Sequence, residues 1–142
     1  MTPEQKLQIL GWIARTMGLW YIFTGATAIN AWRRNATVGR EVAASVAAAP
    51  DHIAQLRSWT VLAVGTLTSL SGLTLAFLSN LAPVFFLACC SVQGAYFAWA
   101  RTALPPVDEA GRKARQISQN AFAMFAASTL FVLGCRTIGV LS

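Results

Sequence analysis

The chain has 142 residues, of which 56% are hydrophobic and 11% are charged, and its formal net charge is +6. A chain this short and this apolar leaves no room for a separate soluble domain. In a soluble protein the positive charge would suggest nucleic acid as a partner. Here the basic residues flank long apolar segments and are explained by membrane topology and lipid head groups, so the sequence argues against nucleic-acid binding.

Four apolar segments have about the length that crosses a bilayer as a helix, namely residues 7–32, 58–79, 81–100 and 117–135. About 20 apolar residues in a helix match the ~30 Å hydrocarbon core of a membrane. Only the first segment contains a charge, Arg15, and none contains Asp, Glu, His or Lys. The sequence therefore predicts a single all-α domain over residues 1–142, an antiparallel four-helix bundle embedded in the membrane.

The start of the first helix carries a capping pattern. Thr2 suits the N-cap, Pro3 suits the first helical position, and Gln5 can return a hydrogen bond to the cap. The first helix is therefore expected to begin in water before it enters lipid. At about 30 residues, or about 45 Å, it should protrude from the membrane or tilt.

The connection after the first span is polar and basic over residues 33–39. An alanine-rich run follows at 40–49, with Val42 and Val46 one helical turn apart, and this pattern predicts a short interfacial helix. The second helix should start near Asp51, where an acidic residue favours a helix N-terminus. The next connection is so short that the second and third helices are expected to form a hairpin.

Small residues recur at helical spacing within the predicted spans. Such stripes allow helix backbones to approach closely, and close packing drives helix association in lipid. The stripes predict helix-packing interfaces at Gly11, Gly18, Gly25, Gly65, Ser69, Gly72 and Gly94. An alternative is that the same glycines make room for a ligand or a cofactor tail.

Basic residues gather in the first and third connections and are missing from the second. The two basic sets are Arg33, Arg34, Arg40 and Arg57, and Arg101, Arg112, Lys113 and Arg115. The positive-inside rule places both sets in the cytoplasm of a bacterial inner membrane, and both chain termini on the periplasmic side. Contacts with lipid head groups are predicted for Arg15, Arg33, Arg34 and Arg40.

Few side chains within the spans carry chemistry. The amide of Gln93 cannot satisfy its own hydrogen bonds in lipid, so it should face protein or a polar ligand. Together with Trp20 and Tyr96 it is a candidate contact for a quinone or a bound phospholipid, with hydrogen bonds between helices as the alternative. Cys89, Cys90 and Cys135 lack zinc-site spacing, and no intrinsic metal or haem is predicted; a redox role for these thiols stays open.

Two strings carry a resemblance to a known family. Leu10-Gly-Trp-Ile-Ala-Arg15-Thr-Met-Gly18, followed by Phe23-Thr-Gly25-Ala, resembles the opening helix of the DoxX-like family. Gly65 with Ser71-Gly72-Leu-Thr-Leu75 is similar to that family's second helix. An acidic residue often found in the family's second helix is absent here, with Thr68 or Ser69 in that neighbourhood, which argues against quinone-reducing chemistry. The resemblance implies a small bacterial membrane protein. Some members of that family are similar to subunits of thiosulfate:quinone oxidoreductase or are associated with redox complexes, and many have no known activity.

These observations favour a non-catalytic accessory subunit of a larger bacterial inner-membrane assembly, redox- or quinone-linked, whose partners are membrane lipids and other integral membrane subunits. The alternative is a homo-oligomeric channel or carrier in which a polar path is lined by Asn30, Thr68, Ser71 and Gln93. An integral-membrane enzyme is the least favoured interpretation, because the spans lack a sufficient set of acid, base and metal-binding groups.

Overall fold

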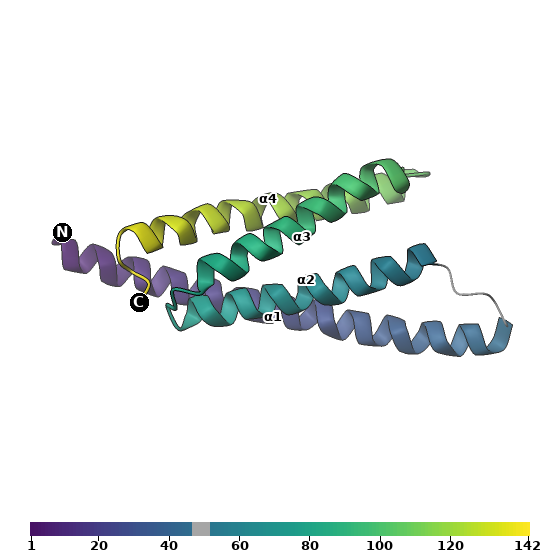
Figure 1. Cartoon of the computed structure of the whole chain (residues 1–142), viewed down its shortest axis with the longest axis horizontal. Helices are drawn as coiled ribbons and strands as arrows, with labels where there is room; N and C mark the ends of the chain where they lie inside the picture. Colours follow the sequence, from purple (N-terminus) through teal and green to yellow (C-terminus); the bar gives the residue numbers. More distant parts are fainter. Residues whose placement is uncertain (47–51) are drawn as a thin grey trace.

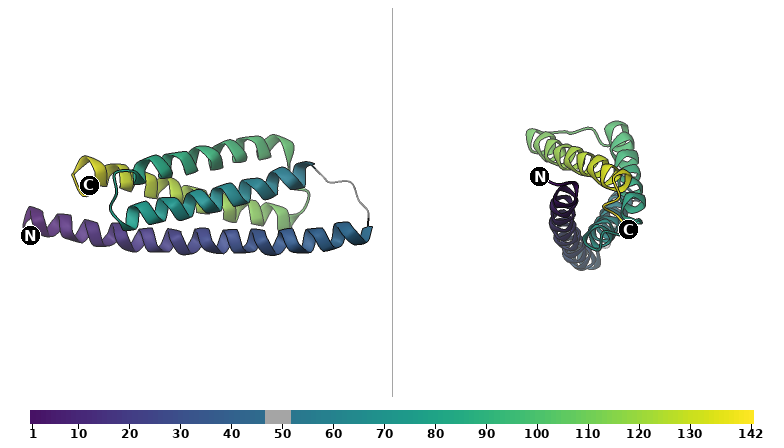
Figure 2. Two further views of the ribbon diagram at one scale, coloured as in Figure 1. Left: turned by 60° about the horizontal axis from the view of Figure 1, so that its bottom comes forward. Right: turned by 90° about the vertical axis from the view of Figure 1, so that its left-hand side faces the viewer.

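The computed structural model describes the backbone of residues 1–46 and 52–142, and the side chains of residues 1–37 and 52–142. These residues form four helices, α1 (Pro3–Val46), α2 (His52–Ala76), α3 (Ala82–Ala103) and α4 (Glu109–Thr137), which lie together as a helical bundle (Figure 1). Both chain termini lie at the end of the bundle where α2 turns into α3 (Figure 2). The prediction of an all-helical fold is confirmed for these residues.

The N-terminus of α1 has the predicted capping box. The helix begins at Pro3, the backbone N–H of Gln5 donates to Thr2 Oγ1 at 3.3 Å, and the backbone N–H of Thr2 donates to Gln5 Oε1 at 3.0 Å. Two backbone donors are thereby satisfied at a helix end that has no preceding turn to supply them.

The first helix is longer than predicted. It continues without a break through residues 33–46, so the separate interfacial helix expected at 40–49 is not confirmed: residues 40–46 are the last turns of α1, and 47–49 lie outside the described residues. No proline interrupts the sequence between Pro3 and Pro50, and the isolated Gly39 costs a helix only about 1 kcal/mol. With 44 residues, α1 is about 66 Å long.

Three helices, α2, α3 and α4, are long and apolar enough to cross a membrane. Most residues of their apolar segments are not buried within the bundle. This is the composition expected of a membrane protein whose outer surface contacts lipid. α1 has the length but a lower apolar content, since the predicted span 7–32 also holds Arg15 and several glycines. Membrane crossing by α1 stays a prediction, consistent with the exposure of Leu19 (62%) and Phe23 (65%).

The backbones of α1 and α2 touch at glycines. A Cβ atom added to Gly18 would lie 2.6 Å from Gly72 O, and one added to Gly72 would lie 2.6 Å from Ile22 N. Gly25 meets Gly65 in the same way one step further along the pair. Such distances leave no space for a side chain, so this contact needs glycine at positions 18, 25 and 72, whereas a Cβ on Gly65 would meet the side chain of Ile29 at 3.1 Å. Gly94 of α3 is packed less tightly, because its Cβ would be 3.8 Å from Phe122.

The turn between α2 and α3 closes the packed end of the bundle. Leu78 adopts a left-handed conformation with φ 52°, and the N–H of Ser79 donates to Thr74 O at 2.9 Å, so α2 ends in a Schellman motif with leucine where glycine is usual. The C-terminal residue is tied to this turn, because Ser142 N–H donates to Leu78 O and Asn80 N–H donates to Ser142 O. α2 and α3 form the predicted hairpin.

Alanine substitutions should have opposite effects on the free energy of unfolding at glycines inside and outside the contact between α1 and α2. Gly18→Ala and Gly72→Ala should each lower the free energy of unfolding by about 1–3 kcal/mol, because the new methyl group pushes two backbones apart. Gly134→Ala is the control, since a Cβ there meets nothing within 4 Å. It should be neutral or stabilising, because alanine favours a helix over glycine by about 1 kcal/mol.

Unfolding by sodium dodecyl sulfate, followed by circular dichroism in mixed micelles, measures all three variants against the parent protein. Equal stability of Gly18→Ala and Gly134→Ala would show that α1 and α2 do not touch at the glycines.

Candidate functional site

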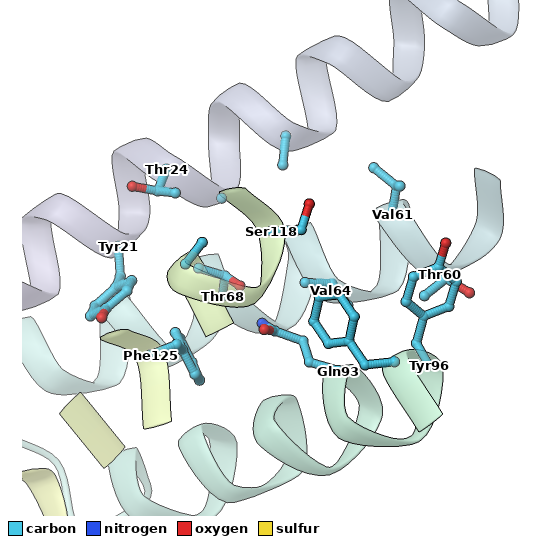
Figure 3. A pocket seen from close by; sticks show the side chains of 15 residues that line it. Tyr21, Thr24, Thr60, Val61, Val64, Thr68, Gln93, Tyr96, Ser118 and Phe125 are labelled. Atoms are coloured by element: carbon cyan, nitrogen blue, oxygen red, sulfur yellow. The ribbon is translucent and has the colours of Figure 1, made fainter. Parts of the chain in front are cut away.

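A cavity of about 310 Å³ lies within the bundle and is lined by all four helices (Figure 3). Its walls are mostly apolar, and a few hydroxyl and amide groups project among them. Its lining residues are Tyr21, Thr24, Gly25, Ala28, Thr60, Val61, Val64, Gly65, Thr68, Gln93, Tyr96, Phe97, Ser118, Ala121 and Phe125. A mostly apolar concave site of this volume, with a small number of polar groups, has the composition of a ligand pocket.

The cavity follows from the way the helices pair. Consecutive helices make the extensive contacts, with α1 held on α2, α2 on α3 and α3 on α4. Across the remaining side, the hydroxyl groups of Tyr21 on α1 and Ser128 on α4 form a hydrogen bond of 2.6 Å. From Tyr21 toward Ala28 of α1, the space between the helix pairs is the cavity.

Three aromatic rings close the inner end of the cavity. The ring of Tyr21 meets Phe86 and Phe125 edge-on at centroid distances of 5.5 and 5.0 Å, and Phe86 stacks on Phe125 at 5.0 Å. The buried apolar core continues from this aromatic cluster through Leu75 and Val132. The cluster therefore separates a packed half of the bundle from a half that contains the cavity.

The polar groups of the cavity are held from α2 and α3. Gln93 Nε2 donates to Cys89 Sγ at 3.3 Å, and Thr68 Oγ1 lies 3.5 Å from the same sulfur. Figure 3 shows the Gln93 side chain extending from α3 toward Thr68. Within the described part of the chain, Gln93 Oε1 and the Tyr96 hydroxyl have no hydrogen-bond partner. One acceptor and one donor–acceptor are thus available to a ligand.

The three residues predicted to contact a ligand do not lie together. Gln93 and Tyr96 both line the cavity, whereas Trp20 is 65% exposed and points away from it. Consecutive helical residues point about 100° apart, so with Tyr21 facing inward Trp20 faces outward. Tyr21 also lines the cavity, although it was not among the three candidate contacts. Its spacing of three from Gly18 and four from Gly25 places it on the glycine face of α1.

The arginines predicted to meet lipid head groups lie on α1. Arg15 is exposed, and its guanidinium group sits 5.4 Å from the ring centroid of Trp12, a cation–π arrangement. Arg33 and Arg34 are exposed, while the side chain of Arg40 lies outside the described residues. The exposed positions are compatible with contacts to anionic lipid, which stay predictions.

The polar residues expected along a channel have different surroundings. Thr68 is buried beside Cys89, and Ser71 is buried with its hydroxyl donating to Leu67 O of its own helix. Asn30 is exposed on α1. Only Thr68 and Gln93 come together, at the wall of the cavity, so a single chain does not arrange the four as one path.

The cysteines are free thiols inside the bundle. Cys89 and Cys135 are buried, and Cys90 Sγ lies 3.2 Å from Thr129 Oγ1. In the described part of the chain, no three His, Cys, Asp or Glu side chains come together as a metal-binding group.

Comparison with family models, with curated proteins and with solved structures yields no match for this chain. The resemblance to the DoxX-like family is therefore a prediction from the quoted strings, and the functional argument rests on the cavity.

The hydrogen bond between Tyr21 and Ser128 predicts an energetic coupling between α1 and α4. Tyr21→Phe and Ser128→Ala should each lower the free energy of unfolding by about 0.5–1.5 kcal/mol, and the double variant should cost little more than either one, because both remove the same bond. Ser91→Ala is the control, since Ser91 is exposed and bonds only to Leu87 O of its own helix. Additive losses in a double-mutant cycle would contradict the coupling.

Proposed function

We propose that this protein is a non-catalytic integral membrane subunit that binds a lipid-like molecule, a quinone or the chain of a phospholipid, in the cavity between its four helices. The observation that carries the proposal is the cavity itself, which is mostly apolar and presents an amide oxygen at Gln93 and a hydroxyl at Tyr96 that no described residue pairs with. An apolar space with a few fixed polar groups selects a ligand that is mainly hydrocarbon.

The surroundings of the cavity support binding without turnover. Its lining residues carry hydroxyl groups, one amide and no ionisable acid or base other than tyrosine. The hydroxyls of Thr24 and Thr60 already donate to Trp20 O and Leu56 O. Such groups orient a carbonyl or a hydroxyl by hydrogen bonding, but they are not the acid, base or nucleophile sets that catalysis requires.

In a membrane, we propose that the four helices cross as an antiparallel bundle with the basic end in the cytoplasm. The described basic residues Arg57, Arg112 and Arg115 lie toward the end opposite the turn between α2 and α3, and the positive-inside rule favours the cytoplasm for such an end. Both termini then face the periplasm of a bacterial inner membrane, and the cavity lies nearer the cytoplasmic side.

Filling the cavity tests the ligand-binding function. In Ala121→Trp the new side chain enters the cavity, so the affinity for decylubiquinone, or the amount of phospholipid that co-purifies, should fall at least about tenfold. Ala123→Trp is the matched control, since Ala123 is an exposed residue of the same helix that does not line the cavity. Native mass spectrometry of the detergent-purified protein measures both. Equal ligand binding by the two variants would contradict the proposal.

An accessory role predicts partners. Gentle extraction of native membranes should recover the protein with other integral membrane subunits, because a bundle with a wide apolar outer surface can bury that surface against them. Mass photometry and peptide identification of the extracted complex measure its composition. Recovery as a homo-oligomer alone would favour the channel alternative.

A further inference from the structure

A second cavity, of about 320 Å³, adjoins the first. Tyr96, Phe97 and Ser118 line both, so the two spaces share a wall and lie in line along the bundle. The second cavity lies where α3 ends and α4 begins, and its remaining lining residues are Arg57, Ala100, Leu104, Pro105, Pro106, Gly111, Ala114 and Arg115. The second cavity thus extends the apolar cavity toward the basic end of the bundle, and the two cavities differ in the charge of their lining.

Positive charge distinguishes the second cavity. Arg57 of α2 and Arg115 of α4 both line it, and its described lining residues include no Asp or Glu. Asp108, the N-cap residue of α4, already accepts a hydrogen bond from the N–H of Gly111 at 2.7 Å. Two guanidinium groups that share a space without a carboxylate raise its affinity for an anion.

The two arginines differ in how they are held. Arg115 is half-buried, and its Nη2 donates to the carbonyl oxygens of Ala100 and Leu104, which fixes the guanidinium group at the C-terminus of α3. Its remaining N–H groups stay available. Arg57 is exposed, has no hydrogen-bond partner among the residues described, and can move to meet a ligand. A fixed cation and a mobile one together suit an anion that enters from the side of the membrane surface.

We infer that the ligand of the proposed binding function is an anionic amphiphile, whose apolar chain occupies the first cavity and whose phosphate or carboxylate head group lies between Arg57 and Arg115. The inference rests on that function and narrows its ligand class. A neutral quinone would fill the apolar cavity but leave both guanidinium groups without an anion. An anionic lipid uses both spaces, with Tyr96 at their junction able to donate to the head group. The same chemistry is offered by a single-chain lipid phosphate and by a membrane phospholipid.

The test compares matched probes on the detergent-purified full chain. Oleyl phosphate and oleyl alcohol have the same hydrocarbon chain and differ in head-group charge, and native mass spectrometry titration measures both. The parent protein should bind oleyl phosphate at least about tenfold more tightly. Arg57→Gln should weaken oleyl phosphate binding about tenfold and leave oleyl alcohol unchanged, whereas Arg57→Lys should retain most of the preference. Arg112→Gln removes the same charge from an exposed position outside both cavities and should change neither affinity.

The outcomes distinguish a failure of the anionic-ligand inference from a failure of the proposed binding function. Equal affinity of the parent protein for the two probes, or equal effects of Arg57→Gln and Arg112→Gln, overturns the anionic ligand. If oleyl alcohol is still excluded by Ala121→Trp in that case, the apolar binding function stands. If neither probe binds, both fall. Dioleoyl phosphatidic acid distinguishes the sources: tighter binding than oleyl phosphate supports a membrane phospholipid, and weaker binding supports a single-chain lipid.

Discussion

The direct contact of the α1 and α2 backbones sets the arrangement of the whole bundle. At Gly18 and Gly72 the two helices leave no space for a side chain, and Gly25 and Gly65 repeat the contact further along. In lipid such a contact gains stability from dispersion and from the absence of side chains that would have to be ordered. Because α1 is held this closely to α2, the gap between α1 and α4 is wider and must be filled by larger side chains. The size of these side chains determines where the bundle is closed and where it stays open.

Tyr21 is the side chain that closes the gap between α1 and α4. Its ring fills the space between α1 and the pair of Phe86 and Phe125, and its hydroxyl reaches Ser128 at 2.6 Å. One turn further along α1, the residues that line the cavity include Gly25 and then Ala28, which are too small to fill the same gap. The cavity is therefore a direct result of side-chain size along one helix face: a large aromatic residue closes one half of the bundle, and small residues leave the other half open.

Sequence patterns predicted the structural features that depend on residues close together in the chain. The capping box of Thr2 and Gln5, the hairpin of α2 and α3, and helical segments over the predicted spans all follow from local chemistry. The length of α1 was underestimated, since basic residues after Trp32 suit a membrane boundary and also a solvated helix. Gln93 was identified as an amide that needs a partner, and Tyr96 as a candidate ligand contact. Their position in one cavity with Thr60 and Ser118 depends on the distance between helix pairs, which no single segment encodes.

An apolar cavity in a bundle that lies in a membrane has a physical tendency to be filled. An empty space deprives its lining of dispersion contacts, and water gains little there because most of the walls offer no hydrogen bonds. A hydrocarbon chain from the bilayer restores those contacts without a desolvation penalty of its own. By mass action, a ligand that binds only the folded bundle also stabilises it. In the proposed function, a bound chain would give the open half of this structure the packing that Tyr21, Phe86 and Phe125 provide in the closed half, and ligand occupancy would then stabilise the fold at the same site.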